Sequence, residues 1–219
     1  MINPADLSAN LAEALAEVFE RARRSLVVVH NGRRGAGAGV VWRTGGIVVT
    51  NRHVVASGRA HGRAHGQARI SLIDGQELPT RLIAEEPEID LAILQVDPNG
   101  ASDLELPAAP IADSRALQVG QIVLAIGHPW GQLAAVSVGI LSGLGEAQVR
   151  GRRGAVPVLR TDVGLAPGNS GGPLMNAAGG VIGINTMIVG GDLGVAIPSQ
   201  VVESFVVEAL GEELRQASV

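Results

Sequence analysis

The sequence predicts an all-β fold, and three observations support that class. Short runs of β-branched and aliphatic residues alternate with Gly, Pro, Asn and Asp, which is typical of strands and turns in a sandwich or barrel. Hydrophobic residues make up 46% of the 219-residue chain, which is enough for one sizeable core. Because the chain has two Phe, two Trp and no Tyr, that core must be built from Val, Ile, Leu and Ala.

The expected elements follow one another along the whole chain. Strands are expected at residues 26–29, 39–42, 47–50, 69–73, 91–96, 122–126, 156–160, 181–184 and 194–197. Apolar residues at helical spacing predict a helix over 6–24, and Pro198 precedes a second one over 199–216. We expect the glycine-rich segment from Gly127 to Gly145 to be a loop, and residues 98–110 to connect two halves.

The most informative segment is Pro-Gly-Asn-Ser-Gly-Gly-Pro-Leu at 167–174, which places one hydroxyl among glycines and prolines. Glycine permits the backbone conformations in which successive N–H groups point toward one place, as an oxyanion hole requires. Ser170 is therefore a candidate nucleophile. A glycine-rich turn with an incidental serine is the alternative for this motif alone.

A serine nucleophile needs a histidine base, and all five histidines precede Ser170. This order excludes an α/β-hydrolase, in which the histidine follows the serine. His53 follows the β-branched run 47–50 and is the best placed base, because a strand can position it rigidly. His30 and His128 are alternatives. His61 and His65 lie among three glycines in a predicted loop, so we expect no metal site.

Asp90 is the aspartate between His53 and Ser170 that opens an apolar run, Asp90-Leu91-Ala92-Ile93-Leu94. A carboxylate at the mouth of a buried strand needs a partner, and a histidine N–H is a suitable one. Asp90 could instead cap its loop by accepting backbone N–H groups, or do both.

These three segments, in this order, resemble the protease domain of the HtrA/Deg family of serine proteases. Further matches are Gly127 to Gly131, Ser137 to Ser142, Gly183 to Thr186 and Val195 to Ser199. The resemblance covers roughly Leu26 to Leu210. It implies a chymotrypsin-like fold of two packed six-stranded antiparallel β-barrels with N- and C-terminal helices. The expected parts are an N-terminal helical segment (1–24), a first barrel with His53 and Asp90 (25–105), and a second barrel with Ser170 (106–219).

The resemblance also implies the roles of the site residues. Ser170 attacks a peptide bond to form an acyl-enzyme, His53 transfers the proton, and Asp90 orients His53. The N–H groups of Gly168, Asn169 and Ser170 are expected around the oxyanion. The substrate pocket is expected to be lined by Gly164, Leu165, Asn185, Thr186 and Ile188.

Two departures from related proteases affect the expected activation and the expected substrate preference. Asn169 replaces the aspartate that binds a new N-terminus in cleavage-activated relatives, so activation by N-terminal cleavage is not expected. Gly164 stands where proteases that cut after Lys or Arg carry an acid, which favours small or medium apolar residues before the cleaved bond. HtrA proteins usually carry PDZ modules, and none is expected within this chain.

We therefore expect a serine endopeptidase acting on unfolded or misfolded polypeptides, without a cofactor, and by resemblance a homotrimer. A catalytically silent, chaperone-like peptide-binding protein is the alternative, and an esterase is a weaker one. A net charge of −4 and a pI near 5.7 argue against a nucleic-acid partner. Without a signal core or a membrane span, the chain as given is expected in the cytoplasm, or in the periplasm or outside the cell if a leader was trimmed.

Overall fold

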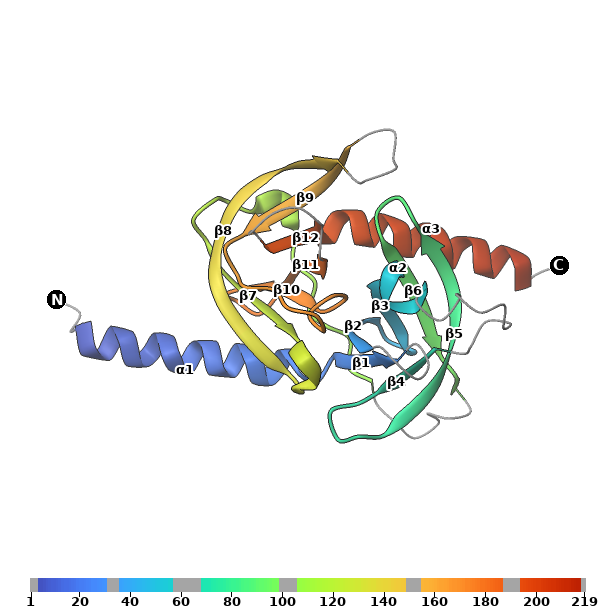
Figure 1. Cartoon of the computed structure of the whole chain (residues 1–219), viewed down its shortest axis with the longest axis horizontal. Coiled ribbons are helices and arrows are strands. Elements are labelled where there is room, and N and C mark those ends of the chain that lie inside the picture. Colours follow the sequence, from blue (N-terminus) through green and yellow to red (C-terminus); the bar gives the residue numbers. More distant parts are fainter. Residues whose placement is uncertain are drawn as a thin grey trace.

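The computed structural model describes residues 4–30, 36–56, 68–98, 106–148, 155–186 and 194–217. Two β-barrels lie side by side, with long helices at the two ends of the chain (Figure 1). The first barrel contains β1 (Leu26–His30), β2 (Ala36–Arg43), β3 (Ile47–Asn51), β4 (Arg69–Ser71), β5 (Glu77–Glu86) and β6 (Leu91–Val96). The second contains β7 (Ile122–Gly127), β8 (Ala135–Gln148), β9 (Ala155–Thr161), β10 (Pro173–Asn176), β11 (Val181–Thr186) and β12 (Gly194–Pro198).

Both barrels are closed and antiparallel, and they share one strand order. The first is ordered β1-β2-β3-β6-β5-β4, and the second follows the same path as β7-β8-β9-β12-β11-β10. Closure leaves no strand edge unpaired, which suits short strands. The expected fold of two six-stranded barrels is confirmed.

The apolar residues form three clusters, not the single core that composition suggested. One cluster fills the first barrel around Val29, Ile70 and Leu94, and another fills the second barrel around Leu141 and Ile182. The third joins the barrels to each other and to both terminal helices. The site between the barrels therefore rests on a continuous packed layer.

Three strands were not expected from the sequence: β5, β8 and β10. The expected loop from Gly127 to Gly145 is wrong over most of its length, because β8 pairs with both β7 and β9. A glycine in β8 allows a neighbouring side chain to pack close to the strand, since a Cβ on Gly139 would lie 2.3 Å from Asp162 Oδ1. The outer face of β8 leaves Val136, Val138 and Ile140 exposed.

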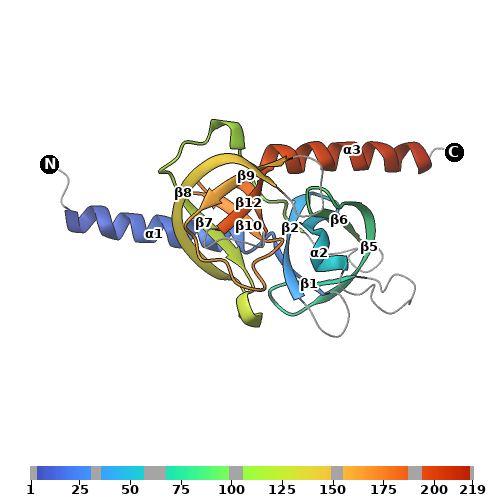
Figure 2. The ribbon, with the colours of Figure 1, turned by 45° about the horizontal axis from the view of Figure 1, so that its top comes forward.

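The terminal helices extend in opposite directions (Figure 2). Helix α1 (Pro4–Ala22) buries Val18 and Ala22 in its last turns, where Val18 lies near Gly179 of the second barrel. Leu11, further toward its N-terminus, is 45% exposed. Helix α3 (Ser199–Ala217) contacts β11 and β12 of the second barrel and β5 of the first.

Candidate active site

His53 and Asp90 are joined by two hydrogen bonds at the rim of the first barrel. His53 lies in the short helix α2 (Arg52–Ala56), which begins directly after β3. Asp90 Oδ2 is 2.7 Å from His53 Nδ1, and Asp90 Oδ1 accepts the backbone N–H of His53 at 2.9 Å. An ionised carboxylate only accepts, so Nδ1 carries the proton and Nε2 is the nitrogen that can act as a base. Asp90 thus both caps α2 and orients the ring.

The backbone of Asp90 has a left-handed conformation, with φ of 56°. Such a conformation is costly for a residue with a side chain and needs support from its surroundings. The Asp90 carbonyl accepts the N–H of Arg52 and the side-chain amide of Asn51, each at 3.0 Å. The end of β3 and the start of α2 therefore fix the main chain of Asp90.

Ser170 belongs to the turn before β10 and packs against the first barrel. Its side chain is buried at 5% exposure, and its carbonyl accepts the N–H of Ala38 at 2.8 Å. The contact requires glycine at the next position: Gly171 has φ of 85°, and a Cβ there would lie 2.1 Å from the Ala38 carbonyl.

Gly37 shows how close Ser170 lies to the histidine helix. A Cβ on Gly37 would be 2.7 Å from Val54 of α2 and 3.0 Å from the Ser170 carbonyl. Within the described residues, no hydrogen bond joins Ser170 Oγ to His53. Such bonds are often long before substrate is bound, so the arrangement remains compatible with a nucleophile and its base.

The turn 166–169 fixes the direction of the Gly168 N–H. Asn169 N–H donates to the Ala166 carbonyl at 2.9 Å, and Gly168 has φ of 106°, as the third residue of a type II turn requires. The Pro167 carbonyl accepts the N–H of Trp130 at 2.9 Å. Because a trans peptide points its C=O and N–H in opposite directions, the Gly168 N–H points away from Trp130.

This geometry corrects one expected donor. The N–H of Asn169 was expected to face the oxyanion, but it is already used to close the turn. The N–H groups of Gly168 and Ser170 make no hydrogen bond to any described residue. They are therefore two unpaired backbone donors at the serine turn.

The expected pocket residues separate into three groups. Gly164 is exposed, and a Cβ there would meet nothing within 4 Å, while Leu165 packs beside Gly194 of β12. Asn185 is fully buried and donates Nδ2 to the Pro173 carbonyl at 2.8 Å, so its side chain supports the serine turn and does not line a pocket. Ile188 lies outside the described residues.

Thr186 has a different place from the expected one. Its side chain is 3% exposed, and Oγ1 donates to Asp90 Oδ2 at 2.9 Å. The threonine side chain thus contacts the histidine–aspartate pair. Local sequence pattern does not indicate this contact, because Thr186 and Asp90 belong to different barrels.

The alternative bases are engaged elsewhere. His30 Nε2 is 2.7 Å from Ser71 Oγ, and the His128 ring is buried with Nδ1 accepting the N–H of Ala134 at 3.2 Å. His61 and His65 lie outside the described residues. The part of the chain that the structure describes holds no group of three or more metal-ligating side chains, and none of its helices is long and apolar enough to cross a bilayer.

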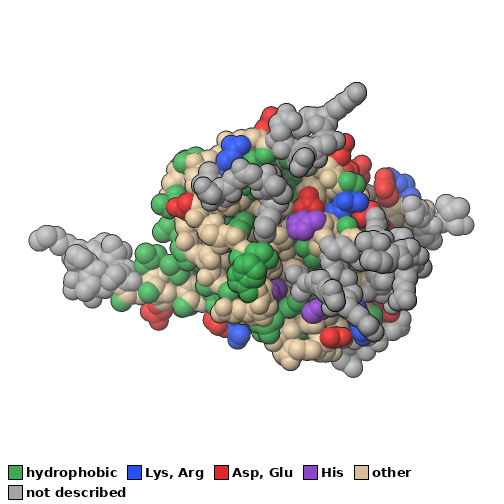
Figure 3. Space-filling model, in the orientation of Figure 1, with side chains coloured by type: hydrophobic (Ala, Val, Ile, Leu, Met, Phe, Trp, Pro, Cys, Tyr) green, Lys and Arg blue, Asp and Glu red, His purple; other side chains and the backbone are tan. Residues whose placement is uncertain are grey.

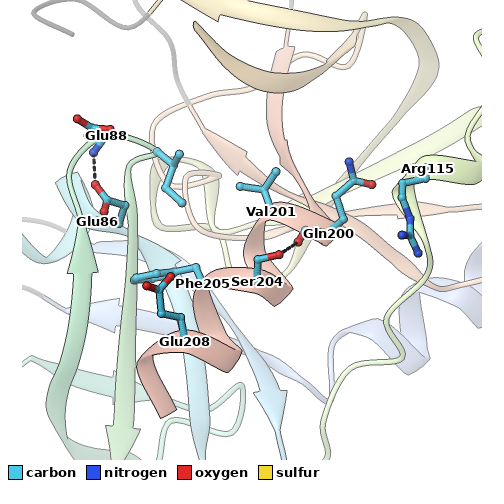
Figure 4. Close-up of a pocket in the computed structure, with 9 residues that line it drawn as sticks. Glu86, Glu88, Arg115, Gln200, Val201, Ser204, Phe205 and Glu208 are labelled. Atoms are coloured by element: carbon cyan, nitrogen blue, oxygen red, sulfur yellow. Dashed lines mark hydrogen bonds between the residues drawn. The ribbon is translucent and has the colours of Figure 1, made fainter. Parts of the chain in front are cut away.

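Histidine side chains are visible near the centre of the face shown in Figure 3. A separate groove lies between α3 and the turn after β5 (Figure 4). Glu86, Glu88 and Glu208 contribute carboxylates to it, and Val201 and Phe205 contribute apolar side chains. The groove contains neither His53 nor Ser170, so it is not part of the candidate active site.

Two antiparallel barrels, with a histidine–aspartate pair from one and a serine turn from the other, define a chymotrypsin-like serine peptidase domain. The family model for the trypsin-like peptidase domain matches residues 37–184. The chain belongs to this family, and within it to the HtrA type.

The similar proteins agree on that type. The chain is 40% identical over 174 residues to a probable periplasmic serine endoprotease DegP-like of Halomonas elongata, covering 77% of this chain and 34% of the relative. It is 38% identical over 171 residues to the putative serine protease HhoA of Synechocystis, covering 75% and 40%. The chain thus spans about a third of the length of the DegP-like relative.

A solved structure of the HtrA-type protease AlgW, a serine-to-alanine variant with a tripeptide, superposes with a TM-score of 0.74. It is 32% identical in sequence, and the match covers 87% of this chain and 61% of that chain. The fold and the family expected from the sequence are confirmed.

Proposed function

We propose that this chain is a serine endopeptidase that hydrolyses peptide bonds in unfolded or misfolded polypeptides through an acyl-enzyme. The observation that carries the proposal is the paired contact between Asp90 and His53, made beside the serine turn of the other barrel. That arrangement supplies a nucleophile, a base in a defined tautomer, and two backbone donors.

In the acylation step, Ser170 Oγ attacks the carbonyl carbon while His53 Nε2 accepts the hydroxyl proton. The resulting oxyanion accepts hydrogen bonds from the N–H groups of Gly168 and Ser170. His53 then donates its proton to the leaving amine, and the C–N bond breaks. In deacylation, water attacks the acyl carbonyl carbon and loses a proton to His53. The bond from that carbon to Ser170 Oγ then breaks, the acid leaves, and His53 returns the proton to Ser170 Oγ.

The substrate class follows from the region around Gly164. No carboxylate stands at this position, and Leu165 adds apolar surface beside it. An Arg or Lys head buried there would be unpaired, whereas Val, Ala, Leu or Ile would gain from burial. We infer a preference for small or medium apolar residues before the cleaved bond.

The partners and compartment are proposed from the same family. The exposed Leu11 on the projecting part of α1 supports assembly into a homotrimer through that helix. The periplasmic names of the DegP-like relatives support a periplasmic site of action. An acidic net charge supports protein substrates over nucleic acid.

A peptide-binding protein without turnover is a second candidate, because no hydrogen bond joins Ser170 Oγ to His53 within the described residues. Turnover of unfolded casein tests the choice. We expect Ser170→Ala to reduce turnover at least about 1,000-fold with an unchanged melting temperature. Ser204→Ala, at an exposed position on α3, is the matched control. An equal rate in the Ser170→Ala variant would exclude the proposed nucleophile.

A further inference from the structure

His128 is a buried histidine that the catalytic steps do not use. Its side chain is 2% exposed, and its ring accepts the N–H of Ala134 through Nδ1. A nitrogen that accepts carries no proton, so the ring is neutral and its proton is on Nε2. Nε2 makes no hydrogen bond of normal geometry among the described residues.

The main chain of the same segment holds the oxyanion turn. His128 N–H donates to the Gly168 carbonyl at 3.0 Å, and Trp130 N–H donates to the Pro167 carbonyl at 2.9 Å. The two carbonyls on either side of the Gly168 N–H are therefore both held by residues 128–130. A movement of this segment would turn the Gly168 N–H away from the oxyanion.

Two strained residues make the segment dependent on the ring. Trp130 has φ of 55° and Ala134 has φ of 52°, both in the left-handed region. Such residues persist only when contacts hold them. The bond from Ala134 N–H to His128 Nδ1 closes the segment between its two ends.

The surroundings of the ring oppose a positive charge. Burial lowers the pKa of His128 below its usual 6.5, and the charge of His30 lowers this pKa further, while the Val27 backbone acts in the opposite direction. Residues 128–134 and 166–170 contain no ionisable side chain besides His128, and β1 contributes only His30. No described carboxylate faces the ring from these segments to compensate a charge.

We propose that His128 is a positioning residue for the oxyanion hole: its neutral ring holds residues 128–134 in the arrangement that aims the Gly168 N–H, and protonation of the ring releases it. Protonated Nδ1 would donate and could no longer accept the Ala134 N–H. This inference rests on the proposed peptidase function and adds a pH dependence to it.

The direction of that dependence follows from the lowered pKa. The folded, closed segment is fully stable above the unfolded pKa of about 6.5, and it loses stability as the pH falls from there to the lower folded pKa. A general base must also be unprotonated to accept the proton of the nucleophile, which accounts for one proton. The acid limb of kcat/KM should therefore involve two protons.

Three variants separate these protons in a peptidase assay between pH 8 and pH 5. His128→Asn places Oδ1 near the position of Nδ1 and cannot titrate, whereas His128→Leu has no acceptor. At pH 8 we expect His128→Leu to lower kcat at least about tenfold with KM little changed, and His128→Asn to restore most of it. His30→Gln, which can still bind Ser71, is the control. Its kcat/KM should still depend on two protons at the acid end.

At the acid end, each unit by which the pH falls should raise the ratio of kcat/KM for His128→Asn to that of the unmutated protein about tenfold. The reason is that kcat/KM of the variant depends on one proton fewer. Parallel profiles for these two proteins would overturn the proposal. So would equal kcat values for His128→Asn and His128→Leu at pH 8.

Trp130 provides a readout that does not need activity. In the Ser170→Ala protein, its emission should show an inflection below pH 6.5 that His128→Asn abolishes, with Trp130→Phe identifying the contribution of Trp42. An inflection that persists in His128→Asn would overturn the positioning role. If the inflection behaves as expected but no peptide is cleaved, the peptidase proposal fails and the control of residues 128–134 by the ring stands.

Discussion

Thr186 Oγ1 donates a 2.9 Å hydrogen bond to Asp90 Oδ2, the same oxygen that contacts His53 Nδ1. Thr186 ends β11 of the second barrel and Asp90 precedes β6 of the first, so this contact crosses the interface between the barrels. The serine turn is tied to β11 as well, through the bond from Gly171 N–H to the Asn185 carbonyl. One strand thus positions both the carboxylate and the serine turn.

We expect Thr186→Val to lower kcat/KM by about 10- to 100-fold, because a hydrogen bond to a charged group is worth about 1.5–3 kcal/mol. The valine keeps the shape of the side chain, so the melting temperature should change little. Thr80→Val removes a hydroxyl that binds the Ala68 carbonyl away from the site, and it is the matched control. Equal kcat/KM values for the two variants would exclude a role for the cross-barrel contact.

The oxyanion turn should not tolerate a side chain at Gly168. A Cβ there would lie 2.1 Å from the His128 carbonyl, and φ is 106°. Displacing this donor should lower kcat by at least about 100-fold with little effect on KM. Gly120→Ala is matched, because Gly120 has φ of 95° with open space around it. If Gly168→Ala turns over substrate as fast as Gly120→Ala, the assignment of this donor is wrong.

Cleavage specificity should follow the character of position 164. Sites mapped by mass spectrometry in a denatured protein should cluster after Val, Ala, Leu or Ile. Gly164→Asp should shift cleavage toward Arg and Lys, since the new carboxylate would pair with their buried charge. Gly211→Asp adds the same charge on α3 and should leave the sites unchanged. A majority of sites after Arg or Lys in the unmutated protein would contradict the pocket assignment.

Assembly should depend on the projecting part of α1. Leu11 is 45% exposed, and burial of such a side chain by a partner is worth about 1.5–3 kcal/mol. We expect light scattering to show a trimer that Leu11→Glu converts to monomer. Leu214→Glu, at a 71% exposed position on α3, should leave the trimer intact. If light scattering shows that the unmutated chain is a monomer, the proposed trimer is wrong.

Local pattern was sufficient for strands with nearly continuous apolar runs, such as Leu91–Val96, whose burial is nearly complete. It failed for β5, where Pro79 is typical of turns and strand ends, and for β8, whose glycines resemble loop signals. Candidate catalytic residues could be named from the sequence because their types and order are chemically constrained. The places of Asn185 and Thr186 could not, because they depend on how two barrels meet.

The central claim is that Ser170 is a nucleophile activated by His53 and stabilised by the Gly168 and Ser170 N–H groups. The most direct measurement is labelling of the native protein with an organophosphonate, followed by mass spectrometry of the peptide that contains residue 170. We predict one covalent adduct on Ser170, formed in the unmutated protein and absent in Ser170→Ala and His53→Ala. An unlabelled Ser170 in the native protein, or an adduct that forms equally fast in the His53→Ala variant, would contradict it.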